Sequence, residues 1–238
     1  MSVIEAVDLV VGYEGRRLVS NCSFALNSGI HVLLGQNGSG KSTLLKTIAG
    51  ILKPLSGRVF IDGADVHSLK PKDRVRIVAY AWQNPFHGFV SLTVEDEIAF
   101  MSRMSGIDVD WRVVRMLVPD ELMSRNPFRL SGGEARRVAL ASVLCGSQKV
   151  WLLDEPFNDL DYDGFQAVRD VIEYGRRSGR TVIVSLHQVA IADTLSPDAF
   201  MLIKDGRLAI GDWSDLSDDV LVSANIIPRH VFKAGGLR

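Results

Sequence analysis

The stretch Gly35-Gln36-Asn37-Gly38-Ser39-Gly40-Lys41-Ser42 fits the spacing G-x-x-x-x-G-K-[ST]. Its glycines let backbone N–H groups converge on a phosphate without a side-chain clash, and the following helix adds its N-terminal donors and dipole. Lys41 can reach β- and γ-phosphate oxygens, and the Ser42 hydroxyl can ligate Mg²⁺. An apolar run precedes the loop, and apolar residues recur after it at helical spacing, at Leu44, Leu45, Ile48 and Leu52. The stretch therefore predicts a phosphate-binding loop rather than an ordinary glycine-rich turn.

A second stretch, Val150-Trp151-Leu152-Leu153-Asp154-Glu155, is an apolar run that ends in two carboxylates. Adjacent residues of a strand face opposite sides, so the two acids can do different jobs. Asp154 is placed to hold Mg²⁺ directly or through water alongside Ser42, and Glu155 can polarise an attacking water. The alternative is a solvated acidic turn after a strand. The phosphate loop in the same chain favours the catalytic interpretation.

A third stretch, Leu130-Ser131-Gly132-Gly133-Glu134, has the spacing of a capping box and so predicts a helix N-terminus. Two consecutive glycines early in a helix cost on the order of 1 kcal/mol each. They are expected where a ligand must approach the backbone closely. The Ser131 hydroxyl, the bare N–H groups and the helix dipole therefore predict a second phosphate site.

Together these motifs resemble those of the ATP-binding cassette (ABC) ATPases, over nearly the whole length of the chain. The resemblance implies an α/β fold, with a P-loop NTPase core, an N-terminal antiparallel β-subdomain and an inserted helical subdomain. It implies a single ABC ATPase domain over 1–238, with the helical subdomain at approximately 88–145. It also implies ATP and Mg²⁺ as cofactors and a head-to-tail dimer. Each ATP would lie between the phosphate loop of one chain and the Ser131–Glu134 segment of the other.

The resemblance also assigns roles to single residues. It implies that Tyr13 stacks on adenine and that the remaining ATP-binding residues are Gly35, Asn37, Gly38, Ser39, Gly40, Lys41, Ser42 and Thr43. The catalytic residues that it implies are Glu155, His187, Gln83 and Lys41. The implied Mg²⁺ ligands are Ser42, Gln83 and Asp154. The residues implied to bind ATP in trans are Ser131, Gly132, Gly133 and Glu134, and Asp161 is implied to lie at the dimer interface.

The chain departs from the family pattern at four places. Asn158 stands where the family prefers a small residue, and Gln188 where an acidic residue is frequent. Glu134 stands where importers often carry Gln, and Ile30-His31 replaces the Glu that commonly follows Gly29. None of these departures removes a group that the chemistry needs, but Asn158 and Gln188 bear on turnover and on coupling between the sites.

The segment Gln83-Asn84-Pro85, with Thr93–Phe100, is similar to the ATPases of energy-coupling-factor importers, which take up cobalt, nickel or vitamins. The tail at 221–228 is weakly similar to the same branch. This similarity implies an integral membrane subunit that docks near Gln83–Val90, with Phe86, Phe89 and Val90 as apolar contacts. The alternative is that the segment merely links the core to the helical subdomain.

Composition limits the kinds of function that are expected for this protein. The 238 residues carry 27 Lys and Arg against 28 Asp and Glu, a net charge of −1, so no overall basic excess favours nucleic acid. The longest apolar run, Ile77–Trp82, is far shorter than the ~20 residues that span a bilayer. Cys22 and Cys145 form no CxxC pattern, which argues against a zinc site and indicates a reducing compartment. We therefore expect a soluble protein that reaches the membrane through a partner.

The leading hypothesis is an ATP-hydrolysing subunit at the cytoplasmic face of the membrane, powering an importer of a metal ion or vitamin. One alternative is a soluble ABC ATPase acting on nucleic acid or ribosomes, although the interval from Lys41 to Ser131 has no room for a long coiled coil. A second alternative is a transporter of another substrate class, importer or exporter. A third is a regulatory cassette without hydrolysis, which the presence of Lys41, Asp154, Glu155 and His187 disfavours.

Hydrophobic patterns give a coarse secondary structure. Strands are predicted at 3–10, 19–26, 30–34, 58–61, 77–82, 150–153 and 181–185, with a terminal hairpin at 200–203 and 207–210. Helical patterns are predicted after the phosphate loop, across about 92–123, and from Ser131 onward. The short apolar runs at 150–153 and 181–185 are typical of parallel strands covered on both faces.

Overall fold

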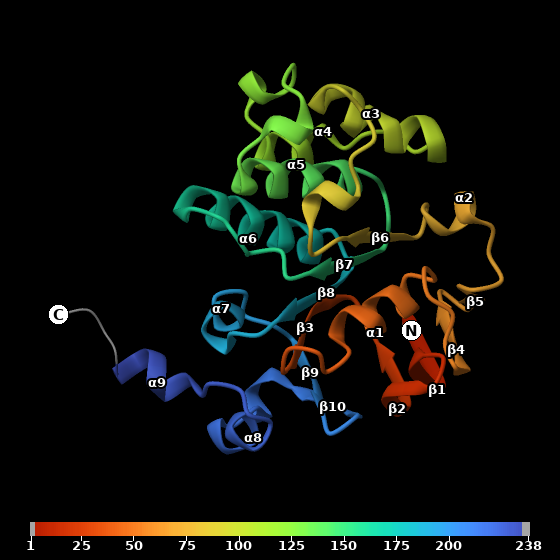
Figure 1. Ribbon diagram of the computed structural model, residues 1–238, viewed down its shortest axis with the longest axis vertical. Helices are drawn as coiled ribbons and strands as arrows, with labels where there is room; N and C mark the ends of the chain where they lie inside the picture. Colours follow the sequence, from red (N-terminus) through yellow and green to blue (C-terminus); the bar gives the residue numbers. More distant parts are fainter. Residues whose placement is uncertain (1–2, 235–238) are drawn as a thin grey trace. The chain divides into compact units, whose positions relative to one another are not determined.

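The computed structural model describes residues 3–234, which divide into two compact units (Figure 1). One unit comprises the residues up to 68 and those from 183 on, and the other is Leu69–Val182. The first carries the phosphate loop. The second carries the acidic strand end and the helix start at Ser131, and it contains the region at 88–145 that was expected to be helical.

A mixed sheet forms the core of the first unit, with the strand order β5-β4-β1-β2-β10-β9-β3-β8. Its N-terminal part is antiparallel: β1 (Ile4–Tyr13) pairs with both β2 (Arg16–Leu26) and β4 (Ser56–Ile61), and β5 (Ala64–Asp65) pairs with β4. The turn between β4 and β5 contains Asp62 and Gly63, both with positive φ, as hairpin turns require. This part confirms the predicted N-terminal antiparallel β-subdomain.

The rest of this sheet is built around β3 (Gly29–Gly35), every residue of which is buried. β3 runs parallel to β9 (Ala199–Lys204), and β9 forms the predicted hairpin with β10 (Arg207–Asp212). β8 (Thr181–Leu186), also fully buried, begins at the boundary between the units. The carboxyl end of β3 leads directly into the phosphate loop and α1 (Lys41–Ile48), as predicted.

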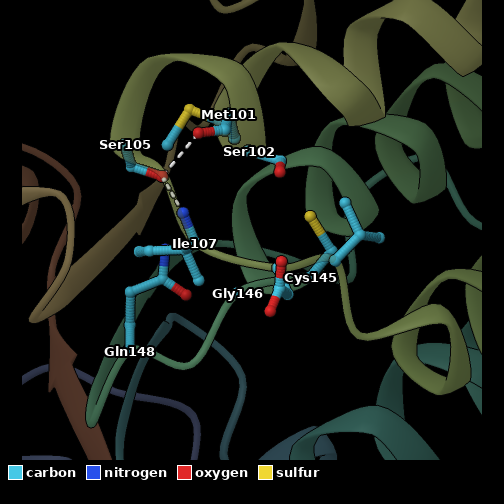
Figure 2. Close-up of a pocket in the computed structure, with 9 residues that line it drawn as sticks. Met101, Ser102, Ser105, Ile107, Cys145, Gly146 and Gln148 are labelled. Atoms are coloured by element: carbon cyan, nitrogen blue, oxygen red, sulfur yellow. Dashed lines mark hydrogen bonds between the residues drawn. The ribbon is translucent and has the colours of Figure 1, made fainter.

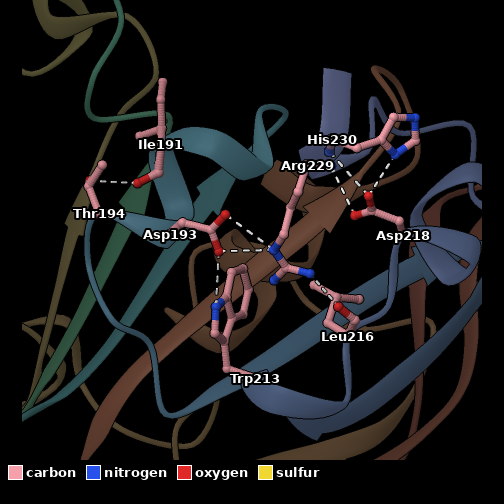
Figure 3. A network of polar contacts seen from close by, with 8 residues as sticks. All are labelled: Ile191, Asp193, Thr194, Trp213, Leu216, Asp218, Arg229 and His230. Atoms are coloured by element: carbon pink, nitrogen blue, oxygen red, sulfur yellow. Dashed lines mark hydrogen bonds and ion pairs between the residues drawn. The ribbon is translucent and has the colours of Figure 1, made fainter. Parts of the chain in front are cut away.

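The C-terminal helices of the first unit were not predicted. They are α7 (Val189–Asp193), α8 (Asp218–Ser223) and α9 (Arg229–Ala234), with the 3₁₀ turn η4 (Trp213–Asp215). A polar network joins them (Figure 3): Arg229 Nε donates to Asp193 Oδ1 at 3.1 Å, and Trp213 Nε1 donates to the same oxygen at 3.2 Å. His230 Nδ1 lies 2.7 Å from Asp218 Oδ2. These contacts fix α9 against α7 and α8.

In the second unit, β6 (Val78–Ala81) runs parallel to β7 (Val150–Asp154), and both strands are buried. The predicted helical region contains α3 (Val94–Ser105) and α4 (Trp111–Leu117), and Ser131 caps α5 (Gly132–Leu144). The remaining short elements of the unit are α2 (Pro71–Arg74), η1 (Pro85–His87), η2 (Asp120–Leu122) and η3 (Pro127–Arg129).

β6 is shorter than the strand predicted at 77–82. It ends at Ala81, and the carbonyl oxygens of Trp82 and Gln83 accept hydrogen bonds from the Arg136 guanidinium. A side chain on α5 therefore takes the place of a strand partner there. Gln83 consequently stands in a loop beyond the end of the strand.

The helix α6 (Tyr162–Arg177) was also not predicted, although its pattern is readable. Its buried residues Val168, Val171, Ile172 and Gly175 follow the i, i+3, i+4, i+7 spacing of an amphipathic helix. Gly175 packs against the fully buried Trp151, because a Cβ at this position would lie 2.7 Å from the indole ring.

A small cavity of about 10 Å³ lies in the second unit among residues from α3, the end of α5 and the loop before β7 (Figure 2). Ser105 Oγ, on its rim, donates to the Met101 carbonyl at 2.6 Å and accepts from Ile107 N at 3.3 Å. This volume has room for about one water molecule, so the cavity is not a nucleotide site. Across residues 3–234, each helix is too short or too polar to cross a lipid bilayer.

Candidate active site

The phosphate loop ends at Gly40, the N-cap of α1, whose φ of 108° lies in the region that favours glycine. A Cβ on Gly40 would lie 3.0 Å from Val19 Cγ2 and 3.1 Å from Leu18 Cβ. Within residues 3–234 this helix start has no side-chain cap, and its first turn contains no acidic residue. An external anion is therefore the natural partner of its N-terminal donors.

Two side chains of the loop fit a phosphate ligand. Lys41 is only 5% exposed, and its Nζ donates to the carbonyl oxygens of Gly35 at 2.8 Å and Gln36 at 3.1 Å. Its ammonium group is thus held against the loop. Ser39 Oγ is buried and has no hydrogen-bond partner among the described residues. A buried hydroxyl without a partner is unfavourable, so a phosphate oxygen fits there.

Two further predicted site residues belong to the first unit. Tyr13 ends β1 and is 50% exposed, so its ring face is accessible for stacking. His187 directly follows β8, and its Nε2 lies 3.3 Å from the Gln188 side-chain nitrogen. Tyr13, the loop at 35–43 and His187 therefore belong to one folded unit, whereas the remaining predicted site residues belong to the other.

Asp154, the last residue of β7, is 2% exposed. The hydroxyl of Tyr80, on the neighbouring strand β6, donates to Asp154 Oδ2 at 3.1 Å. Tyr80 was not predicted as a site residue. The signal was present in the sequence, because a tyrosine in a buried strand needs a partner for its hydroxyl.

Glu155 forms the centre of a second cluster. Its φ of 51° places a non-glycine residue in the left-handed region, a strain that is typical of functional sites. Its Oε2 accepts hydrogen bonds from Gln83 Nε2 at 3.0 Å and from Asn158 Nδ2 at 2.8 Å. The fold thus brings the predicted Gln83 and Glu155 together. It adds Asn158, which the sequence had marked only as a departure.

Arg136, on α5, is a further residue that sequence reasoning missed. It is 3% exposed, donates to the carbonyl oxygens of Trp82 and Gln83, and lies 3.7 Å from Asp159 Oδ2. Burial lowers the pKa of its guanidinium. The negative charges of Asp159, Glu155 and Asp154 act in the other direction and raise this pKa, but by less. A buried cation thus ties the Gln83 loop to the loop that follows Glu155.

The helix start at Ser131 has the predicted capping box. Glu134 N donates to Ser131 Oγ at 3.4 Å, and Glu134 Oε2 accepts from the Ser131 backbone N–H and hydroxyl, both at 2.9 Å. Hydrogen bonds from the Ser131 backbone and then its hydroxyl lower the pKa of Glu134, and Arg125 and Arg137 contribute through their charges, against the effect of desolvation. This helix start therefore carries an anion of its own.

The two glycines after Ser131 also have a partner inside the chain. A Cβ on Gly133 would lie 3.0 Å from the Asp159 carbonyl oxygen, and one on Gly132 would lie 3.5 Å from Asp159 Cβ. Close packing of the loop after Glu155 thus gives Gly133 a role besides ligand approach, whereas a side chain on Gly132 would make only an ordinary contact there. Asp161, in the same loop, is the N-cap of α6 and accepts from Gly164 N at 2.8 Å.

Comparison with known proteins identifies the family of this chain. The ABC transporter family matches this chain over residues 19–158. The chain belongs to this family. A putative ABC transporter ATP-binding protein of Pyrococcus horikoshii is 38% identical over 213 residues, which cover 87% of this chain and 82% of the relative. The energy-coupling factor transporter ATP-binding protein EcfA1 of Methanospirillum hungatei is 34% identical over 246 residues, covering 97% and 89%.

Solved structures agree with this ABC assignment. A dimeric ATP-binding cassette in a post-hydrolysis state, bound to ADP and Pi, has a TM-score of 0.78 at 22% identity, covering 88% of this chain and 98% of the other. The cbiO1 protein of Clostridium perfringens, part of the transporter complex cbiONQ, has a TM-score of 0.73 at 25% identity, covering 89% and 88%. The predicted ABC ATPase fold and the similarity to the energy-coupling-factor branch are confirmed. The chain is an ABC transporter ATPase, which binds and hydrolyses ATP.

Proposed function

We propose that this ABC ATPase powers an importer of the energy-coupling-factor type, for a metal ion or a vitamin, from the cytoplasmic face of the membrane. Its partners in this proposal are a second ATPase subunit and an integral membrane subunit, and nucleic acid is not among them. The named relatives support the transporter class. The observation that carries the catalytic part is the Glu155 carboxylate held by Gln83 directly after the buried Asp154.

The proposed binding chemistry uses both helix starts. Tyr13 stacks on adenine, while Lys41, Ser39 and the N-terminus of α1 bind the phosphates. Ser42, Gln83 and Asp154 would hold Mg²⁺, which would supply positive charge to neutralise the β- and γ-phosphates. A buried carboxylate with amide and hydroxyl oxygens is a donor set that suits this hard cation. The segment Ser131–Glu134 of a second chain completes the γ-phosphate site, and Asp161 lies at that dimer interface.

In the proposed hydrolysis, Glu155 accepts a proton from the water that attacks the γ-phosphorus, and the bond from that phosphorus to the bridging oxygen breaks to release ADP and phosphate. His187 contacts the γ-phosphate and orients the water. Glu155→Gln should therefore still bind MgATP but lose roughly 10²–10⁴-fold in turnover, the usual contribution of a general base. Glu121→Gln, at an exposed position of η2, is the matched control and should retain full activity. Near-normal steady-state ATPase in Glu155→Gln would reject this role.

The proposed docking surface for the membrane subunit lies beside Gln83. Phe86, Val90, Leu92 and Phe128 are 38%, 62%, 76% and 52% exposed. Phe89, expected to contact the partner, is instead 7% exposed, and its ring packs edge-on against Phe86 and Phe128 with both centroid distances at 5.9 Å. Buried Glu97 fixes the backbone here, because its Oε2 accepts from Val90 N at 2.9 Å and Ser91 N at 2.8 Å. Exposed apolar residues on and near a fixed loop fit a protein partner.

This docking proposal is tested by co-purification from the native membrane, with identification of the hydrophobic partner. The double variant Phe86→Ser, Val90→Ser should keep its ATPase activity but lose the partner. Met104→Ser, at a position of α3 that is 58% exposed, is the control and should retain the partner. Recovery of the partner with the double variant at the wild-type level would show that this surface is not the dock.

A further inference from the structure

Asn158 lies three positions after Glu155, in the loop that joins β7 to α6. Its Nδ2 donates to Glu155 Oε2 at 2.8 Å, and Gln83 Nε2 donates to the same oxygen at 3.0 Å. The two donors come from different loops, since Gln83 follows β6. One oxygen of the carboxylate is therefore held by two amides.

The two loops that carry these amides both contact one buried cation, Arg136. Arg136 donates to the Gln83 carbonyl oxygen and pairs at 3.7 Å with Asp159, the residue after Asn158. The first turn of α5 packs on the same loop, because Gly133 closely approaches the Asp159 carbonyl. The loop that presents Asn158 and the loop that presents Gln83 are thus both anchored on α5.

The two hydrogen bonds to Glu155 Oε2 restrict rotation of the Glu155 carboxylate about its terminal torsion. The terminal torsion of a glutamate is broad, so the carboxylate plane is not fixed by its rotamer. A general base must lie within hydrogen-bond reach of the proton that it accepts. Gln83 also has a second task in the proposed mechanism, as a Mg²⁺ ligand, whereas Asn158 has no contact with nucleotide or metal in that scheme.

We propose that Asn158 is a positioning residue for hydrolysis, holding the Glu155 carboxylate in the orientation from which it accepts a proton. This inference rests on the proposed function of Glu155 as the base. It gives a role to a residue larger than the small one expected at this position. It also assigns Arg136 the task of anchoring the two loops that carry the amide donors.

The test is a double-mutant cycle on the full-length chain, read as kcat and KM for ATP. Asn158→Ala should lower kcat by about 10-fold and leave KM unchanged, by analogy with residues that orient metal ligands, whose loss typically costs about 10–100-fold. Asp163→Ala, at an exposed position in the first turn of α6, is the control and should change neither value. In the Glu155→Gln background, single-turnover hydrolysis of radiolabelled ATP should be unaffected by Asn158→Ala, because coupled residues are not additive.

Two results would overturn the proposal: an unchanged kcat in Asn158→Ala, or an equal further loss in the Glu155→Gln background. If Asn158→Ala does not fold, Asn158→Leu carries the same cycle, because it keeps a side chain of similar size and removes the donor without adding a charge beside Glu155. Failure of the proposed function is read separately, from the single variant Glu155→Gln. Normal turnover in that variant would remove Glu155 as the base, whatever Asn158 does.

Discussion

The two helix starts that the sequence marks as phosphate sites differ in what already occupies them. α1 begins at Gly40 with no capping side chain and no acid in its first turn, and Lys41 stands at its first position. α5 begins at Ser131 with a complete capping box and with Glu134 in its first turn. The start of α1 lies in the first folded unit and the start of α5 in the second.

This difference shows that a glycine-rich helix start is not always a free anion-binding site. At α1 the dipole and the N-terminal donors are left for a ligand, so phosphate meets no internal competitor. At α5 the Glu134 carboxylate accepts hydrogen bonds from the Ser131 backbone N–H and hydroxyl, and these bonds lower its pKa. A phosphate that approaches Ser131 therefore has to compete with a carboxylate of the same chain. α5 should accordingly be the weaker of the two sites.

Among changes at the two helix starts, the largest expected effect follows from removing the cation of the stronger site, Lys41. Lys41→Ala should weaken MgATP binding by about 10–100-fold and lower turnover with it, because a hydrogen bond to a charged group contributes about 1.5–3 kcal/mol. The matched control is Lys53→Ala, at an exposed position after α1, which should bind nucleotide normally. Titration with a fluorescent ATP analogue and steady-state ATPase check both values. Wild-type affinity in Lys41→Ala would contradict the assignment of α1 as the main phosphate site.

The next effect tests whether the α5 start serves a second chain. Ser131→Arg and Lys41→Ala should each be inactive as homodimers, because each carries its defect in both sites. In a mixed dimer, one site combines an intact Lys41 with an intact Ser131 from the neighbour, so mixing should restore partial ATPase. Ser214→Arg, at an exposed position in η4, controls for the added arginine and should stay active.

Mixed dimers that form but stay inactive would mean either that each site lies within a single chain or that both sites must fire together. Dimerisation of Glu155→Gln in saturating ATP, measured by light scattering, separates these two cases. A shared site predicts ATP-induced dimers of this variant. A protein that stays monomeric under these conditions would reject the shared site for the isolated subunit.

Local motifs made both helix starts predictable, because their determinants lie within a few residues. Ser131 and Glu134 are one helical turn apart, and Gly40 is adjacent to Lys41. The clusters around the two acids depend on residues far apart in the chain. Gln83 and Glu155 are separated by 72 positions, and Tyr80 and Asp154 by 74. The family resemblance supplied Gln83, but Tyr80 has no local motif that names its partner.

The sequence also could not show which apolar side chains of a loop are buried and which are exposed. Phe86 and Phe89 are equally apolar in one short segment, yet the first is 38% exposed and the second 7%. The outcome depends on Phe128, which follows α3 and α4 in the chain and packs against Phe89. By contrast, α6 was a readable pattern that went unrecognised, since Val168, Val171, Ile172 and Gly175 lie on one face.

A smaller effect is expected from removing the Glu134 carboxylate, which competes with phosphate at the start of α5. Glu134→Gln should let ATP induce dimers of the Glu155→Gln protein at a concentration about 2–5-fold lower, because a charge at a helix N-terminus contributes about 0.3–1 kcal/mol. Glu95→Gln, in the exposed first turn of α3, removes a comparable charge and should leave this concentration unchanged. An unchanged or higher concentration for Glu134→Gln would show that the carboxylate does not compete with phosphate.

The smallest effect is the pH dependence of the same carboxylate. Because the pKa of Glu134 is lowered in the folded chain, its contribution to stability is fully present above its ordinary value of 4.5. That contribution is lost as the pH falls through the lowered pKa. Glu134→Gln has no such titration, so its Tm should lie below that of the wild type at neutral pH, and the difference should shrink on acidification below 4.5. Differential scanning calorimetry across this range measures the difference. A gap that stays constant down to the acid limit would mean that the charge of Glu134 does not stabilise the α5 start, and the internal anion would then no longer distinguish it from α1.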